Sequence, residues 1–127
     1  MALRSAKEMK MHETIIKSIA GIYEQKGAAQ VLTNLMSQSA VVEGITVDLI
    51  VKAPFTIYMK VETDTSVTEG EAIAWKGIAD KLGTFFLMVP EPLKAEALRI
   101  IAKVGIKNIR LCYYSIAENK LKFKNLP

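Results

Sequence analysis

Apolar residues recur at intervals of three and four in three segments of the chain, the spacing that places them on one face of a helix. The first segment, 5–26, opens with Ser5 and Glu8, a pair that forms a capping box at a helix start. The other two segments are 67–82 and 93–104, and all three are followed directly by a glycine. Because glycine often stands just beyond a helix end, the pattern predicts three amphipathic helices.

Short runs of apolar and β-branched residues lie between these helices. ITVDLIVK and FTIYMKVET flank an Ala-Pro break and predict an antiparallel hairpin over 45–63. TFFLMVP predicts a strand over 84–89 that is buried on both faces, and IKNIRLCYYSI predicts a strand over 106–116. The mixed stretch 29–42 predicts one or two further strands, and the tail AENKLKFKNLP is a candidate for a last one.

The order of these elements predicts the fold class. The second half of the chain alternates strand, helix, strand, helix and strand, which makes parallel pairs with right-handed crossovers. The hairpin adds antiparallel pairing, so we expect a three-layer α/β/α domain with a central mixed sheet and helices on both faces. A chain of 127 residues, half of them apolar, fits one such domain over 1–127.

Composition excludes several classes of protein. No apolar run approaches the roughly 18 residues that a membrane-spanning helix needs, and the N-terminal residues have no apolar signal core, so we expect a cytoplasmic protein without a membrane partner. Cys112 is the only cysteine, which excludes an internal disulfide and a cysteine cluster for zinc. His12 is the only histidine, which excludes a histidine-rich metal site and, unless His12 serves it, a Ser-His-Asp triad.

The charge of the chain is uneven along its length. Its net charge is +4, but from Lys94 onward eight basic residues face two acidic ones, a balance of +6. The first 93 residues carry nine basic and eleven acidic residues, a balance of −2. A basic end on a near-neutral body favours a polyanionic partner such as nucleic acid. The alternative is a solvated lysine-rich surface with no partner.

Two carboxylates stand in the apolar strand runs, Asp48 in VDLIV and Glu62 in VET. Strands seldom contain acidic residues in such runs, so each needs a cation, a hydrogen bond or solvent. Carboxylates on adjacent strands can hold Mg²⁺, which prefers oxygen ligands and activates bound water. The alternative is that both occupy exposed polar positions, or that Glu62 forms a salt bridge with Lys52 or Lys60.

The order of a helix, an Asp-bearing strand, a Glu-bearing strand, a capped helix and a strand resembles the PD-(D/E)xK nuclease family. The resemblance covers roughly residues 8 to 116 and is based on VDLIV, YMKVETDT, TEGEAIAWKGIADKLG and TFFLMVP. This family has the restriction-endonuclease-like fold and includes archaeal Holliday-junction resolvases. The resemblance implies a nuclease that depends on Mg²⁺ or Mn²⁺ and acts on DNA rather than RNA.

The resemblance also implies roles for particular acidic residues. Asp48 matches the strand aspartate of the family, and Glu62 matches its second acid, which together bind the metal. Glu13 is a candidate for the glutamate on the first helix that often completes the site. Asp64 is a candidate for a third metal ligand, because added negative charge favours binding of a divalent cation.

The catalytic lysine of the family is displaced in this chain. The family places it two positions after the second acid, where this sequence has Asp64. Lys60, two positions before Glu62, shares a strand face with it and is one candidate for the lysine. Lys76, on the following helix, is the other, because family members are known in which the lysine has moved there.

Three functions therefore remain open. The first is a metal-dependent nuclease acting on DNA, and the second is a nucleic-acid-binding relative with the same fold that does not cleave. The third is a small α/β scaffold or assembly protein that does not touch nucleic acid. Nucleases of this fold often work as dimers, so we also expect a homodimer, with the alternating tail LKFKNLP as a candidate strand across its interface.

Overall fold

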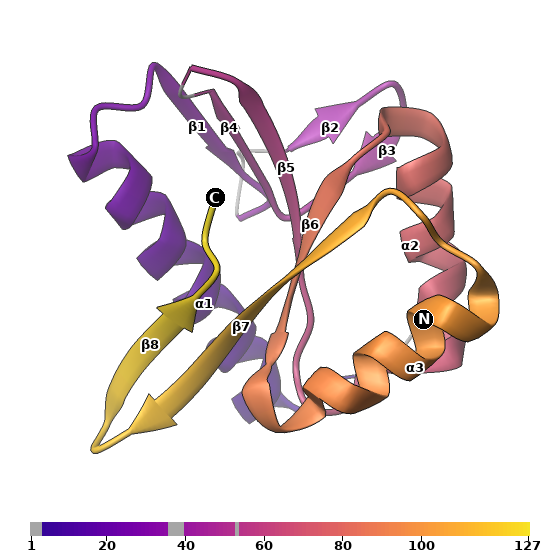
Figure 1. The fold of residues 1–127 in the computed structure, drawn as a ribbon. Helices are drawn as coiled ribbons and strands as arrows, with labels where there is room; N and C mark the ends of the chain where they lie inside the picture. Colours follow the sequence, from indigo (N-terminus) through magenta and orange to yellow (C-terminus); the bar gives the residue numbers. More distant parts are fainter. Residues whose placement is uncertain (1–3, 36–39, 53) are drawn as a thin grey trace.

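The computed structural model of the protein describes residues 4–35, 40–52 and 54–127 (Figure 1). Within these residues the chain forms three α-helices, one short 3₁₀ helix and eight strands. The helices are α1 (Ala6–Gln25), α2 (Glu69–Leu82), η1 (Glu91–Leu93) and α3 (Lys94–Val104). The strands are β1 (Gln30–Thr33), β2 (Val41–Val42), β3 (Ile45–Thr46), β4 (Leu49–Lys52), β5 (Thr56–Val61), β6 (Phe85–Pro90), β7 (Ile109–Ala117) and β8 (Lys120–Lys124).

Six of the strands form one mixed sheet in the order β1-β4-β5-β6-β7-β8. The pairs β1–β4, β4–β5 and β7–β8 are antiparallel, whereas β5–β6 and β6–β7 are parallel. Each parallel pair is joined through a helix, the connection that parallel neighbours require. The sheet is strongly curled, and the expected α/β class with a mixed sheet is confirmed.

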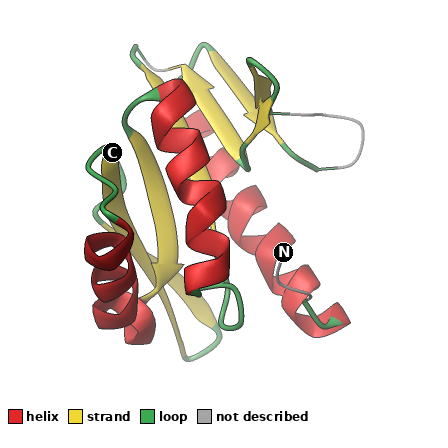
Figure 2. Ribbon diagram, turned by 90° about the vertical axis from the view of Figure 1, so that its right-hand side faces the viewer, coloured by secondary structure: helices red, strands yellow, loops and turns green. Residues whose placement is uncertain are grey.

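Helices cover both faces of this sheet, as Figures 1 and 2 show from two directions. On one face, Ile15, Ile16 and Ile19 of α1 pack in a cluster with alternate residues of β4 and β5. On the other face, Trp75 of α2 and Ile100 of α3 belong to a second cluster with alternate residues of β6 and β7. The period-two alternation of the strands thus supplies two separate cores to a single sheet.

The helix ends follow the signals in the sequence. Ser5 Oγ accepts a hydrogen bond from the Glu8 N–H at the start of α1, and Thr68 Oγ1 accepts one from the Glu71 N–H at the start of α2. Gly105 ends α3 with φ 80°, a left-handed conformation that favours glycine. Among the described residues, no helix is long and apolar enough to cross a membrane.

The strand expected between residues 45 and 52 is divided in two, which corrects that prediction. Residues Ile45–Thr46 form β3, which pairs with β2 in a separate two-stranded sheet, and the main sheet resumes at Leu49. Asp48 lies in the link, where its carboxylate accepts a hydrogen bond from the Val61 N–H at 2.7 Å. At this point the Val47 N–H donates to the Ala40 carbonyl at 2.9 Å, while the Val61 N–H of β5 donates to the Asp48 side chain instead of a main-chain acceptor.

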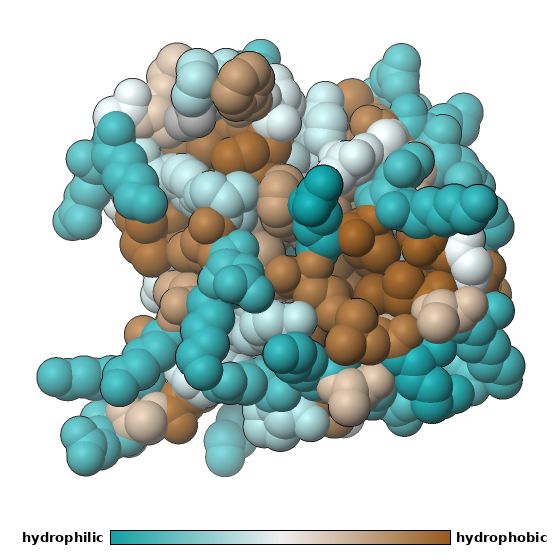
Figure 3. Space-filling view, viewed as in Figure 1, coloured by the Kyte–Doolittle hydropathy of each residue, from teal (hydrophilic) through white to brown (hydrophobic). Residues whose placement is uncertain are grey.

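The tail forms a strand, β8, which pairs with β7 of the same chain at the edge of the sheet. Glu118 and Asn119, both with positive φ, make the two-residue turn that a tight hairpin requires. The side chains of Lys120, Lys122 and Lys124 are exposed. The alternating Leu121 and Phe123 pack against the cluster that α1 forms with β4 and β5. Hydrophilic side chains project from this edge at the lower left of Figure 3.

Candidate functional site

The two carboxylates predicted from the sequence lie at the same end of the sheet. Asp48 directly precedes β4 and Glu62 directly follows β5, and the antiparallel pairing of these strands brings the start of one beside the end of the other. Both residues are buried, with 3% of Asp48 and none of Glu62 exposed. Buried carboxylates need partners, so the contacts of each define what it can do.

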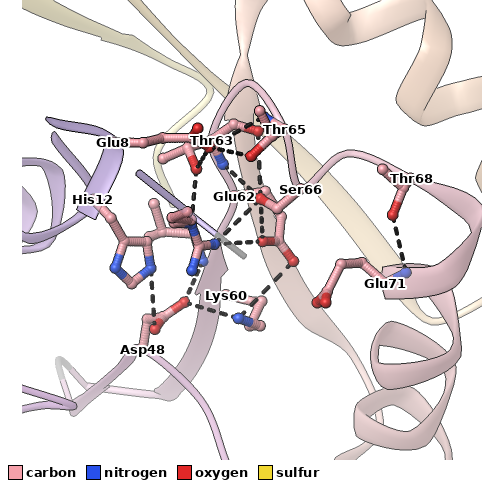
Figure 4. Close-up of polar contacts among 12 residues, drawn as sticks. Glu8, His12, Asp48, Lys60, Glu62, Thr63, Thr65, Ser66, Thr68 and Glu71 are labelled. Carbon is pink, nitrogen blue, oxygen red and sulfur yellow. Dashed lines mark hydrogen bonds and ion pairs between the residues drawn. The ribbon is translucent and has the colours of Figure 1, made fainter. Parts of the chain in front are cut away.

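Lys60 stands between the two carboxylates (Figure 4). Its Nζ lies 3.5 Å from Asp48 Oδ2 and 3.9 Å from Glu62 Oε2. Burial acts to lower the pKa of Lys60, but the neighbouring carboxylates outweigh burial and raise it, so the side chain is an ammonium at neutral pH. The structure thus brings together three of the residues proposed from the sequence, with Lys60 as the shared countercharge.

Glu62 is enclosed by hydrogen-bond donors on both oxygens. Arg4 Nη2 and Ser66 Oγ donate to Oε1 at 3.0 and 2.7 Å, and Trp75 Nε1 donates to Oε2 at 2.7 Å. Burial raises the pKa of the Glu62 carboxyl, and the contacts with Lys60, Trp75 and Ser66 offset only part of that rise. A carboxylate without exposure and with both oxygens engaged does not fit the role of a metal ligand.

Asp48 divides its contacts between its two oxygens. Oδ2 accepts the hydrogen bond from the Val61 N–H and faces Lys60, whereas Oδ1 lies 3.4 Å from His12 Nε2. Burial acts to raise the pKa of Asp48, but the contacts with His12, Lys60 and the Val61 N–H outweigh it and lower the pKa. Asp48 is therefore ionised at neutral pH.

His12 approaches Asp48 without making a good hydrogen bond. Its Nε2 is within ion-pair distance of Asp48 Oδ1, but within the described part of the chain this buried nitrogen has no hydrogen-bond partner. The side chain is 15% exposed. An unsatisfied buried nitrogen facing a carboxylate is an uncommon arrangement that requires an explanation.

A cleft of about 630 Å³ opens beside Asp48. Side chains from α1, the start of β4, β5 and the first turns of α2 line it, and they include His12, Asp48, Lys60 and Glu71. Figure 4 shows these four side chains facing the same space. Asp48 borders this cleft although only 3% of it is exposed, whereas Glu62 lies behind Lys60 and does not line the cleft.

A second set of contacts fastens α1 to the loop after β5. Glu8 Oε2 accepts hydrogen bonds from Thr63 Oγ1, the Thr65 N–H and Thr65 Oγ1. Burial acts to raise the pKa of Glu8, but these donors and the charge of Arg4 lower it. Arg4 also donates from Nε to Thr63 Oγ1 at 2.8 Å. These contacts hold the start of α1, and with it Arg4 and His12, against the candidate site.

Sequence reasoning did not assign Arg4, Glu8 or His12 to the site. Glu8 was identified only as part of a capping box. Its N–H does donate to Ser5 Oγ in that cap, and its carboxylate also accepts hydrogen bonds from the distant loop. More than 50 residues separate Arg4 and Glu8 from their partners on the loop. Helical periodicity carries no signal for such contacts, because it describes only which face of a helix is apolar.

Three other residues proposed from the sequence lie elsewhere. Glu13 is exposed on α1, since it is turned by about 100° around the helix from His12. Lys76 is exposed on α2 and forms an ion pair with Asp80 at 3.5 Å. Asp64 is exposed in the loop after β5, beyond the strand alternation that aligns Lys60 with Glu62. None of the three lines the cleft.

The residues present fit the expected metal site only in part. In the part of the chain that the structure describes, no group of three or more His, Cys, Asp or Glu side chains is arranged to hold a metal ion. Glu62 does not fit, because its oxygens are engaged, and Asp64 does not lie with Asp48. Asp48 fits as a single carboxylate ligand, because it borders the open cleft.

Comparison with known proteins assigns neither a family nor a function to this chain. No protein-family model matches the sequence, and a search of curated proteins finds no match. The resemblance to PD-(D/E)xK nucleases therefore remains a prediction from the motifs quoted above.

Proposed function

We propose that the protein is a nuclease-like relative of the PD-(D/E)xK family that acts on DNA with a divalent cation, Mg²⁺ or Mn²⁺, bound at Asp48. The observation that carries this proposal is the meeting of Asp48 and Lys60 at the mouth of a cleft, with Oδ2 and Nζ 3.5 Å apart. An acid and an ammonium at adjoining strand ends are two of the three side chains that the resemblance implies for phosphodiester hydrolysis by this family.

The order of elements supports the same proposal at the level of the fold. A helix, three antiparallel strands, a crossover helix and a parallel strand follow one another as α1, β1, β4, β5, α2 and β6. This is the order on which the resemblance to the restriction-endonuclease-like fold is based. Under the proposal, Asp48 and Glu62 occupy the strand ends at which that fold carries its acids.

The charges of the cleft explain why a cation would be needed. Asp48 and Glu71 balance Arg4 and Lys60 among the charged side chains that line it, so a phosphate gains little net attraction there. A divalent ion at Asp48 would supply the missing charge and would lower the pKa of a bound water. Lys60 would stabilise the charge that develops on the phosphate.

Glu62 would act as a positioning residue under this proposal. Its carboxylate lies 3.9 Å from Lys60 Nζ and is itself fixed by Arg4, Ser66 and Trp75. Because its hydrogen-bond donors fix the Glu62 carboxylate, this carboxylate would keep the Lys60 ammonium at the edge of the cleft. The role predicted for Glu62 thus changes from metal ligand to support for Lys60.

Nicking of supercoiled plasmid tests the nuclease proposal. We expect nicking in Mg²⁺ or Mn²⁺ that is lost by at least about a hundredfold in Asp48→Asn, because the variant keeps the shape of the side chain but removes the charge that binds a cation. Glu13→Gln and Lys76→Ala are matched controls that should retain full activity, because both residues are exposed and neither lines the cleft. Equal nicking by wild type and Asp48→Asn would exclude this site.

A second candidate function is nucleic-acid binding without cleavage. The enclosure of Glu62 favours it, as does Asp64 at the motif position of the lysine, because both weaken the expected catalytic centre. Phosphate contacts would come from the exposed lysines of β8. Their alternative role is protection of a sheet edge against pairing with other chains.

Binding to a labelled DNA duplex at two salt concentrations tests this second function. Affinity should fall steeply as salt rises, and the double variant Lys120→Ala/Lys122→Ala should bind more weakly with a shallower salt slope. Lys76→Ala serves as the control for loss of one exposed lysine. Binding without nicking favours the second function, and no binding at low salt contradicts both functions.

A further inference from the structure

We infer that the cleft beside Asp48 binds an unpaired nucleotide of single-stranded DNA, with the phosphate at Lys60 and the base against Ile73 of α2. This assignment rests on the proposed function and deepens it, because it names single strands rather than intact duplex as the preferred substrate. Three features support it: the size of the cleft, the apolar surface that α2 adds to the lining, and the position of the charged groups.

The cleft has the size of a site for one small molecule. Its volume of about 630 Å³ lies within the range of roughly 300–1,000 Å³ that is typical of small-ligand sites. A duplex presents its bases only as edges within the grooves, because the face of each base is stacked on its neighbours. A cleft of this size therefore suits a nucleotide that has left the stack, as in enzymes that act on single strands or flipped bases.

The first turns of α2 contribute an apolar surface to the cleft. Ile73 lines the cleft and is 74% exposed, because α2 turns Ala72 and Trp75 toward the core instead. Gly70 and Ala74 line the same cleft one helical turn apart, and their small size leaves the helix surface low beside Ile73. A single exposed apolar side chain is common on proteins, but here it stands at a cleft, where the flat face of a base can cover it.

The glycine in this surface is not required by the packing of α2. Among the described residues, a Cβ added at Gly70 would meet only Thr68 Oγ1, at 3.8 Å, which is an ordinary contact. Glycine also disfavours a helix relative to alanine. A larger side chain at Gly70 would therefore occupy the cleft without a clash inside the fold, which makes this position a probe of what the cleft holds.

The charged pair of the proposed site comes from the strand side of the cleft. Lys60 lies on β5 and Asp48 directly before β4, and the Lys60 side chain is 18% exposed. α2 brings the carboxylate of Glu71 to the lining, so a phosphate is disfavoured on the α2 side. A nucleotide has a matching division, with its charge on the phosphate and apolar faces on the base. A phosphate at Lys60 therefore leaves the base to lie against Ile73.

Anisotropy of a labelled ten-nucleotide single strand, with Ca²⁺ as an oxygen-binding cation, tests the inference. A duplex of the same sequence should bind at least about tenfold more weakly, because a base pair has to open first. Ile73→Ser and Gly70→Leu should each weaken single-strand binding by about fivefold or more, the lower end of the effect of one base contact. Leu98→Ser and Gly77→Leu are matched controls that should bind like the wild type, because neither residue lines the cleft.

A strand of ten abasic nucleotides separates the base contact from the phosphate contact. The wild type should bind it about fivefold more weakly than the normal strand. Ile73→Ser should bind the abasic strand as well as the wild type does, because the variant and the abasic strand each remove the same contact and their effects do not add.

Several outcomes would overturn the inference. They are equal or tighter binding of the duplex, an unchanged single-strand affinity in Ile73→Ser, and an equal loss in Leu98→Ser. Thermal unfolding of each variant without DNA separates loss of binding from loss of the fold, and Ile73→Ala provides a further variant.

The plasmid assay distinguishes this inference from the proposed function. Negative supercoiling favours strand opening, so nicking of supercoiled plasmid is still expected, and it should be slower in Ile73→Ser. Nicking that depends on Asp48 but is equal in Ile73→Ser would sustain the nuclease and overturn the base contact. Binding of single strands that depends on Ile73, without any cleavage, would sustain the base contact and contradict the nuclease.

Discussion

The two carboxylates beside Lys60, Asp48 directly before β4 and Glu62 directly after β5, are both buried but have different surroundings. The closed side contains Glu62, which has no exposed surface and is held by Arg4, Ser66 and Trp75. The open side contains Asp48, which borders the cleft. Glu62 thus supports the fold on one side of Lys60, whereas Asp48 on the other side borders the cleft.

The pKa directions follow this difference. Burial dominates at Glu62 and raises its pKa, whereas contacts with His12, Lys60 and the Val61 N–H overcome burial at Asp48 and lower its pKa. Two acids that both stand in apolar strand runs can therefore differ in function because of what surrounds them in space. A buried acid is therefore better judged by its donors than by its strand.

The largest effect on stability is expected from removing the carboxylate on the closed side. We expect Glu62→Ala to lower the free energy of unfolding by about 3–5 kcal/mol, because the Arg4 and Lys60 charges and the Trp75 indole N–H lose a shared buried partner. Urea unfolding followed by circular dichroism measures the loss, in this variant and in those below. A change below about 1 kcal/mol would show that Glu62 is not an integral part of the network.

Removing one donor from the closed side gives a smaller effect and a control. Trp75→Phe keeps most of the aromatic volume but deletes the N–H that reaches Glu62 Oε2 at 2.7 Å. We expect a loss of about 1–3 kcal/mol, the cost of leaving one buried acceptor with fewer donors. If Trp75→Phe destabilised the protein as much as Glu62→Ala, packing rather than the hydrogen bond would be responsible.

The pH dependence of stability should have opposite signs at the two acids. The pKa of Asp48 is lowered from its ordinary 3.8, so its contribution is present above that pH and is lost as the pH falls through the folded-state pKa. The pKa of Glu62 is raised from 4.5, so ionising it costs stability as the pH rises from 4.5 through its folded-state pKa.

Two neutral variants separate these contributions. Relative to Asp48→Asn, the wild type should lose its advantage in free energy of unfolding as the pH falls below 3.8. Relative to that of Glu62→Gln, the free energy of unfolding of the wild type should decrease as the pH rises above 4.5. If the difference in free energy of unfolding between wild type and variant changed with pH in the same direction for both variants, the opposite pKa shifts of Asp48 and Glu62 would be contradicted.

The smallest effect is expected where an ion pair is exposed. Lys76 and Asp80 are 3.5 Å apart with about half or more of each side chain in solvent. We expect Lys76→Ala to change the free energy of unfolding by no more than about 0.5 kcal/mol, because solvent screens such pairs. A loss comparable to that of Trp75→Phe would assign Lys76 a structural role that its contacts do not indicate.

Much of the fold could be predicted from local patterns. The expected helices over 5–26, 67–82 and 93–104 agree with α1, α2 and α3 to within two residues at each end. The apolar run at 84–89 is β6, buried between two parallel neighbours. The pattern of ITVDLIVK does not predict the division at Asp48, because it is that of an uninterrupted strand and the contacts of Val47 with Ala40 and of Asp48 with Val61 join residues that are not adjacent in sequence.

Local patterns are sufficient to predict the three helices, most of the strands and the neighbouring positions of Asp48, Lys60 and Glu62, because periodicity and strand alternation are set by residues near one another in the chain. Only the folded chain shows that donors enclose Glu62, whereas Asp48 borders the cleft. That difference depends on Arg4, 58 residues from Glu62, and on His12, both carried by the start of α1. How one helix crosses a sheet is set by packing over the whole core, and no local spacing encodes it.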